Sequence, residues 1–263
     1  MVSRFKTHEG SVIAPQGFLV YNQMVVPYMD KLWRSNMREN KRARRERLSA
    51  ALEGLEKAYP EAKPALEFSS PFELLVATML SAQCTDKQVN KTTRTLFPVY
   101  HTAEAFAGLD EDTLCGYIKG CGLYRAKSKN IIAAAKILTR DYGGEVPADR
   151  DALMELPGVG RKTANVVVSN AFNIDAIAVD THVFRVANRI GLAAAKDVLN
   201  TEKQLMESIP QAKWSKAHHW LIYHGRGVCS ARNPKCAACP ISAYCGDYIN
   251  REEIGRAIKP PAP

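Results

Sequence analysis

Long apolar runs and a secretion signal are both absent from this chain of 263 residues. Uninterrupted apolar runs, such as residues 74–77, are far too short for a bilayer, which needs about 20 apolar residues in a helix. The N-terminus also lacks the basic segment followed by an apolar one that marks a secretory signal peptide. These absences predict an intracellular, cytoplasmic protein without a membrane partner.

The alternating pattern of strands is missing as well. Residues 166–168 and 177–179 are rich in β-branched residues, but they are better interpreted as buried helix and as an extended connection. Apolar residues at helical spacing predict an all-α fold. The expected helices run from Lys31 or Asn40 to Tyr59, then from Ser70, and over 87–96, 110–119, 125–142, 149–155, 160–172, 180–190, 201–209 and 213–224.

One helix start is especially clear, in the sequence "SSPFELLVATMLSAQ". Ser70 can cap the helix and Pro71 suits its first position. Glu73 stands three residues after Ser70, which is the spacing of a capping box. We therefore expect a helix that begins at Pro71.

The net charge of +9 is concentrated in one segment. Residues 31–47 hold eight Lys or Arg and two acidic residues, whereas the rest of the chain holds 28 basic and 25 acidic residues. Such a segment either contacts a polyanion such as nucleic acid or forms a solvated helix face.

Seven cysteines, an odd number without a secretion signal, argue against a disulfide framework and for metal ligation. Four of them have the spacing C-x6-C-x2-C-x5-C, namely Cys229, Cys236, Cys239 and Cys245. Structural zinc sites usually have two C-x2-C pairs. Four thiolates within 17 residues favour a [4Fe–4S] cluster, with zinc as the alternative.

The stretch "LPGVGRKTANVVVSNAF" joins a tight turn to a buried helix. Gly158 and Gly160 permit sharp backbone geometry and leave N–H groups exposed at a helix N-terminus, where a phosphate can bind. This is the pattern of a helix-hairpin-helix unit. Pro-Gly-x-Gly is also a common connector between helices, so the pattern alone does not decide between the two.

Lys162 and Asp180 are the candidate catalytic pair. The positive end of the helix dipole and partial burial would both favour a neutral, nucleophilic amine at Lys162. The alternative is a surface lysine that binds phosphate as a cation. Asp180 follows an apolar approach at a helix start, where it is either an N-cap or a carboxylate that faces Lys162.

Together with "IAVDTHVFRV", the hairpin stretch closely resembles the endonuclease III family of DNA glycosylases and AP lyases. The resemblance covers about residues 45–250. It implies that Lys162 and Asp180, 18 positions apart, are the catalytic pair, and it makes a [4Fe–4S] cluster on the four cysteines the expected cofactor.

The family likeness further implies residues that contact DNA. Gln83 and Leu123 would fill the gap left by a flipped nucleotide, although Cys121 departs from the bulkier residue of many relatives. Without the resemblance, Leu123 would be expected in the core. The full DNA-binding set is Gln83, Leu123, Gly158, Val159, Gly160, Arg161, Arg232 and Lys235.

The implied function is base excision repair in the bacterial cytoplasm. A monomer would bind double-stranded DNA, remove a damaged pyrimidine and cleave 3′ to the abasic site by β-elimination. The alternatives are a relative with another base preference, such as oxidised purines, and a non-catalytic iron–sulfur DNA-binding or redox-sensing protein. We expect an extension at 1–40, a cluster domain at 41–63 plus 175–250, a six-helix domain at 64–174 and a tail at 251–263.

Overall fold

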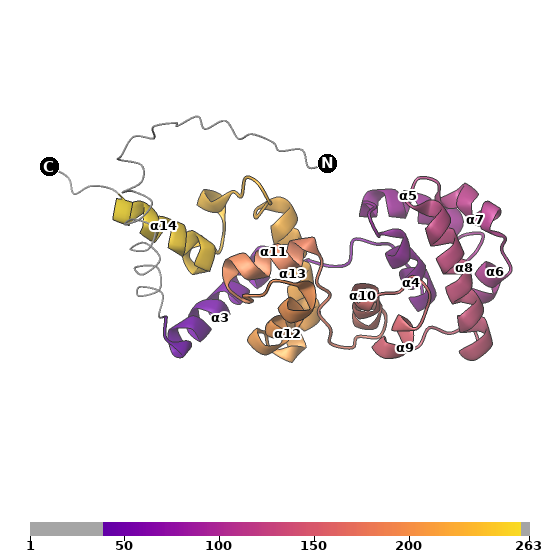
Figure 1. Cartoon of the computed structure of the whole chain (residues 1–263), viewed down its shortest axis with the longest axis horizontal. Helices are drawn as coiled ribbons and strands as arrows, with labels where there is room; N and C mark the ends of the chain where they lie inside the picture. Colours follow the sequence, from indigo (N-terminus) through magenta and orange to yellow (C-terminus); the bar gives the residue numbers. More distant parts are fainter. Residues whose placement is uncertain (1–38, 259–263) are drawn as a thin grey trace, which may run out of the picture. The chain divides into compact units, whose positions relative to one another are not determined.

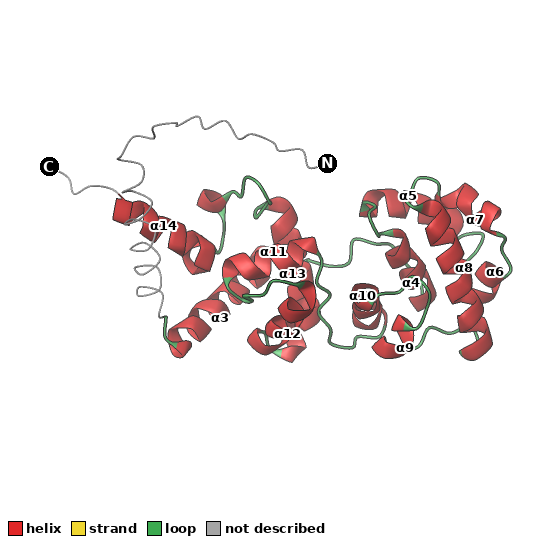
Figure 2. Cartoon of the chain, viewed as in Figure 1, coloured by secondary structure: helices red, strands yellow, loops and turns green. Residues whose placement is uncertain are grey.

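Helices make up all the regular structure of residues 39–258, the part of the chain that the computed structural model describes (Figure 2). No strand occurs in that range, which confirms the all-α prediction. The expected extension at 1–40 falls almost entirely outside the described residues. Within them, no helix is long and apolar enough to cross a membrane.

The helices follow one another in the order shown in Figure 1. They are α3 Lys41–Ala58, α4 Pro71–Leu80, α5 Asp86–Leu96, α6 Ala103–Ala107, α7 Glu111–Ile118, α8 Tyr124–Asp141, α9 Arg150–Met154, α10 Arg161–Ala171, α11 Thr181–Ile190, α12 Val198–Ser208, α13 Trp214–Gly227 and α14 Gly246–Ile258. Residues 39–258 also contain three 3₁₀ helices, namely η2 Gln211–Lys213, η3 Cys236–Ala238 and η4 Ser242–Tyr244.

The predicted helices are present with small shifts at their ends. Helix α12 begins at Val198 rather than Thr201, because the Asp197 side chain caps it by accepting from the N–H of Asn200. The other possible start of α3, at Lys31, lies outside the described residues. Helices α6 and α14 were not expected from the sequence, and α14 runs beyond the predicted boundary at 250.

The predicted capping of α4 is confirmed with one difference. The N–H of Glu73 donates to the Ser70 hydroxyl at 3.2 Å, as an N-cap requires. The Glu73 carboxylate accepts from the N–H of Ser69 at 2.6 Å, one residue before the partner in a standard capping box. The reciprocal arrangement still fixes the start of α4.

A first hydrophobic core lies among helices α4 to α10. Helix α8 packs against α6, α7 and α4, and α4 packs against α10. The rings of Phe72 and Phe106 meet edge to face with centroids 5.3 Å apart. Residues 64–174 hold seven helices, one more than the six expected, and both α6 and α9 have only five residues.

A second core joins α3, from Leu48 onward, to α11, α12 and α13. Helix α11 packs against α13, α12 and α14. The buried residues of this second core include Leu52, Val186, Leu205 and Trp220. We propose that the two cores correspond to the two domains inferred from the sequence, 64–174 and 41–63 plus 175–250.

Candidate active site and cysteine pocket

Lys162 and Asp180 line the same pocket. The pocket holds about 570 Å³ of space, its open mouth included. Its walls come from helices of both cores, with Thr78 of α4 on one side and His218 of α13 on the other. The structure therefore brings the two candidate catalytic residues together at one concave site.

Lys162 is the second residue of α10, and its side chain is exposed. The partial burial expected from the sequence is therefore wrong for the free protein, because the pocket is open at this point. The N-cap residue Gly160 has no side chain to bond the first N–H groups of α10. The positive end of the helix thus stays available to an anion beside the amine.

Asp180 caps helix α11. Its Oδ1 atom accepts from the N–H groups of His182 and Val183, both at 2.8 Å. Among the described residues Oδ2 makes no hydrogen bond, so it is left for a reacting group. The N-cap and the catalytic interpretations are therefore compatible, because each uses a different oxygen of one carboxylate.

His182 makes a local contact beside Asp180. Its Nδ1 atom lies 3.2 Å from the guanidinium of Arg185. That arginine donates to the carbonyls of Gly225 and Cys229, which ties α11 to the end of α13. His182 thus belongs to a structural network.

Sequence reasoning missed two histidines of the pocket, His218 and His219. Burial lowers the pKa of His219 to about 4. Burial, together with the neighbouring His219, lowers the pKa of His218 to about 3. Both imidazoles are therefore neutral at physiological pH. Their rings meet edge to face, with centroids 4.9 Å apart. The only sequence signal was a pair of histidines inside an amphipathic helix, which is more often structural.

The two glycines of the hairpin before α10 differ in their backbone conformation and in the space around them. Gly158 has φ +78°, and a Cβ there would lie 2.9 Å from Asn130, so only glycine fits. A Cβ on Gly160 would meet nothing within 4 Å. The open space at Gly160 lies where a phosphate would approach the helix N-terminus.

Two other residues of the hairpin, Val159 and Arg161, make contacts within the protein. Val159 is buried, and its N–H donates to Leu156. The guanidinium of Arg161 makes two hydrogen bonds of 2.8 Å to the buried carboxylate of Glu202. The predicted contacts of Val159 and Arg161 with DNA stay predictions, and the Arg161 side chain is 34% exposed beside its ion pair.

Gln83 and Leu123, which were predicted to fill the gap left by a flipped nucleotide, both have a positive φ angle. The angles are +52° and +61°, which lie in the left-handed region that residues other than glycine rarely adopt. Leu123 is 58% exposed, so the interpretation of Leu123 as a core residue is wrong. Strained, exposed residues of this kind concentrate at functional sites. The two loops touch, since a Cβ on Gly122 would lie 3.6 Å from the carbonyl oxygen of Gln83.

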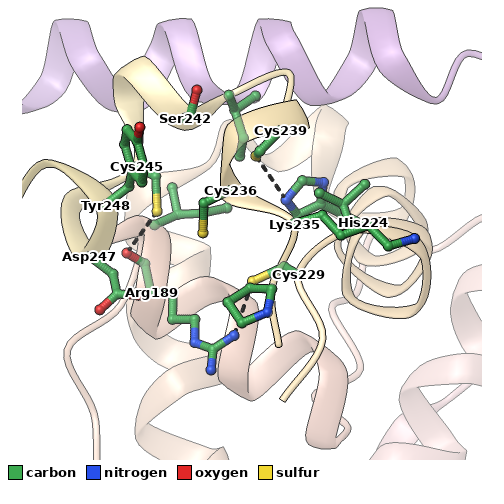
Figure 3. A pocket seen from close by; sticks show the side chains of 14 residues that line it. Arg189, His224, Cys229, Lys235, Cys236, Cys239, Ser242, Cys245, Asp247 and Tyr248 are labelled. Atoms are coloured by element: carbon green, nitrogen blue, oxygen red, sulfur yellow. Dashed lines mark hydrogen bonds between the residues drawn. The ribbon is translucent and has the colours of Figure 1, made fainter. Parts of the chain in front are cut away.

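The four clustered cysteines line a second pocket (Figure 3). Within the described range, no three His, Cys, Asp or Glu side chains are grouped closely enough to hold a single metal ion. Four thiols that surround a space suit a cluster of several irons better than one zinc ion. Cys229, Cys236, Cys239 and Cys245 would hold it.

Polar groups from α11 and α13 contact these sulfurs. The Arg189 guanidinium lies 3.4 Å from the Cys229 sulfur, and His224 Nε2 lies 3.6 Å from that of Cys239. Burial raises the pKa of the Cys239 and Cys245 thiols. Cluster binding must therefore displace protons from them, which couples it to pH.

Basic side chains surround the two pockets. Arg232 and Lys235 are exposed on the loop between the first two cysteines. Arg226 pairs with Asp86 at 2.8 Å, and both line the pocket of Lys162. Among the described residues neither Arg232 nor Lys235 makes an ion pair, and the contact of this loop with DNA stays a prediction.

Comparison with known proteins agrees with this geometry. Residues 76–211 match the HhH-GPD superfamily of base excision DNA repair proteins. Residues 229–245 match the iron–sulfur binding domain of endonuclease III. The endonuclease III of Bacillus subtilis is 52% identical over 198 residues, which cover 75% of this chain and 90% of the relative. The chain belongs to the endonuclease III family.

Other family members give the same result. The Escherichia coli K12 endonuclease III is 49% identical, and the alignment covers 74% of this chain and 92% of that one. A solved structure of a trapped covalent endonuclease III–DNA intermediate matches with a TM-score of 0.75 and 46% identity, covering 79% of this chain and 98% of that one. The chain is thus a DNA-binding base excision repair glycosylase and AP lyase that carries a [4Fe–4S] cluster.

Proposed function

We propose that Lys162 is the nucleophile of this enzyme and that Asp180 assists it. The observation that supports the proposal is the shared pocket, which Lys162 and Asp180 both line. The Lys162 side chain is exposed, and the cap of α11 uses only one carboxylate oxygen of Asp180. A flipped nucleotide entering this pocket would meet the Lys162 amine, whose nitrogen attacks C1′ and expels the base. The sugar ring then opens at the C1′–O4′ bond, which leaves a Schiff base between Lys162 and C1′. Loss of a proton from C2′ expels the 3′ phosphate by β-elimination, and the strand breaks 3′ to the lesion.

Asp180 acts through the oxygen that the cap of α11 leaves unused. A carboxylate at this position stabilises positive charge that develops on the sugar and can take the proton released by the amine. The cluster supplies structural rigidity to the basic loop of Arg232 and Lys235 when it is bound. No step of base removal needs an electron from it.

The preferred substrate in this proposal is an oxidised pyrimidine in double-stranded DNA. Support comes from the similarity to endonuclease III over most of the chain. Base release from defined lesions tests the preference, and faster release of oxidised purines would overturn it. We further propose that the enzyme acts as a monomer, and that it acts in the cytoplasm because the relatives compared are bacterial.

Borohydride trapping on DNA with an abasic site tests the nucleophile. The reagent reduces a Schiff base to a stable amine, so the wild-type enzyme should form a covalent adduct and the Lys162→Ala variant should form none. An adduct that persists in Lys162→Ala, or its absence in the wild type, would end the proposal.

Asp180→Asn is the matched test of the carboxylate. It keeps the size of the side chain and a cap on α11, so DNA binding should stay while turnover falls by roughly a hundredfold or more. Loss of binding in parallel with turnover would instead make Asp180 purely structural.

A further inference from the structure

The segment that leads to Asp180, called the approach segment below, has no regular structure of its own. Residues 173–180 form neither helix nor strand, yet Ile177 and Ala178 are each only 1% exposed. Buried backbone carbonyls need hydrogen-bond donors, and no neighbouring strand supplies them here. Two side chains from different helices do so instead.

The first of these side chains is Asn165 of α10. Its Nδ2 group donates to the carbonyl of Ile177 at 3.0 Å. Asn165 stands one helical turn after Lys162 on the same helix, so the helix that carries the nucleophile also holds the approach to Asp180. The Asn165 Oδ1 atom is buried and has no hydrogen-bond partner among the described residues, which is destabilising. An apolar residue would avoid this cost but would not hold the carbonyl.

The second side chain is His218 of α13. Its Nδ1 atom lies 2.7 Å from the carbonyl oxygen of Ala178, two residues before Asp180. A carbonyl can only accept, so Nδ1 carries the proton and the neutral ring has its lone pair on Nε2. The burial of His218 keeps this tautomer fixed.

Helices α10 and α13 are also joined directly to each other. The hydroxyls of Ser169 and Ser215 lie 2.8 Å apart, and His219 Nε2 lies 3.0 Å from Asn170 Oδ1. The two donors that hold the approach segment therefore belong to one frame. Movement of either helix would shift Asp180 relative to Lys162.

We propose that Asn165 and His218 are positioning residues that set the place of Asp180 relative to Lys162. The inference rests on the proposed function of that pair. Neither residue needs to contact the DNA, since each acts through a backbone carbonyl of the segment before Asp180. Misplacement of a catalytic group by about 1 Å can cost a hundredfold in rate.

Two amide substitutions at His218 separate positioning from mere packing. In His218→Asn the side-chain amide nitrogen lies close to the former Nδ1 position, so the bond to Ala178 can be kept. In His218→Gln the amide reaches toward the former Nε2 position, and the bond is lost. We expect single-turnover base excision to stay within about threefold of wild type for Asn and to fall about tenfold to a hundredfold for Gln.

The decisive measurement repeats His218→Gln in the Asp180→Asn background. A residue that acts only by placing Asp180 should cause little further loss there, whereas independent effects would multiply. Ser208→Ala is the control, because it removes a hydroxyl that donates to the Leu192 carbonyl at 2.8 Å, outside the α10–α13 frame, and it should leave the excision rate unchanged. Cluster absorbance and the thermal midpoint confirm that each variant is folded.

Asn165→Asp provides a second route if His218→Gln does not fold. It keeps the shape of the side chain but replaces the donor by an oxygen that repels the Ile177 carbonyl. The excision rate should therefore fall. In the Asp180→Asn background the same substitution should cause little further loss. Equal rates for His218→Asn and His218→Gln, or losses that multiply with Asp180→Asn, would overturn the positioning role. Failure of the proposed function looks different, since Asp180→Asn alone would then retain the wild-type rate.

Discussion

Gly158 and Gly160 of the hairpin lie two positions apart, but their surroundings differ. Gly158 combines a positive φ with close neighbours at Asn130 and Met79, so the fold itself requires glycine there. Gly160 has a φ of −93°, which any residue adopts, and open space where a Cβ would stand. The fold itself therefore does not require glycine at Gly160, and we propose that the open space there admits a DNA phosphate to the backbone N–H groups.

Alanine substitutions at these two positions should accordingly separate stability from binding. Gly158→Ala should lower the thermal midpoint by several degrees, since strain and a clash cost about 1–3 kcal/mol. Gly160→Ala should leave the midpoint unchanged and weaken the affinity for abasic-site DNA about tenfold, because the methyl group keeps a phosphate from the N–H groups. Fluorescence anisotropy and thermal melts measure the two effects. The reverse pattern would contradict this division.

At the scale of the element, helix α13 carries buried histidines at its contact with α10. The hydrogen bond from His219 to Asn170 links the two helices, while burial lowers the pKa of His219 to about 4 from an ordinary 6.5. An unfolded chain binds a proton at this histidine below pH 6.5, but the folded protein does so only near pH 4. The stability from the neutral ring is therefore complete above about pH 6.5 and is lost as the pH falls toward 4.

His219→Gln should flatten this dependence. The amide keeps a hydrogen-bonding group but cannot titrate, and one pKa unit corresponds to about 1.4 kcal/mol, so roughly 3 kcal/mol of pH-dependent stability should disappear. The drop in thermal midpoint between pH 7 and pH 4.5 should then be roughly 5–10 °C smaller than in the wild type. An equal drop in both proteins would show that His219 is not the responsible group.

The elements also show what the sequence could and could not reveal. Capping residues and apolar periodicity predicted α4, α10 and α11 almost to the residue. Helix α6, with the sequence AEAFA, is too short for a period to appear. The left-handed backbone of Leu123 depends on loop contacts rather than local preference. His218 finds its carbonyl partner 40 residues away, a pairing that no local pattern contains.

For the whole molecule, the net charge of +9 bears on how the enzyme finds DNA. Much of the excess lies in the basic segment 31–47, of which the structure describes residues from 39 onward. Arg47 is held by the carbonyls of Ile190 and Tyr244, so it anchors α3 rather than meeting a partner. Lys41 and Arg45 are exposed on the same helix, so they are candidates for contact with phosphates.

Replacing Lys41 and Arg45 together by Gln tests the basic start of α3 without disturbing the anchor at Arg47. Each phosphate contact releases condensed counterions and contributes about −0.9 to the slope of log K against log salt concentration. The double variant should bind abasic-site DNA more weakly at low salt and with a slope shallower by about 2. Lys136→Gln, an exposed change on α8, should leave the slope unaltered. A slope equal to that of the wild type in the double variant would make the basic start of α3 a solvated helix face, because binding that engages these cations cannot avoid releasing the ions they displace.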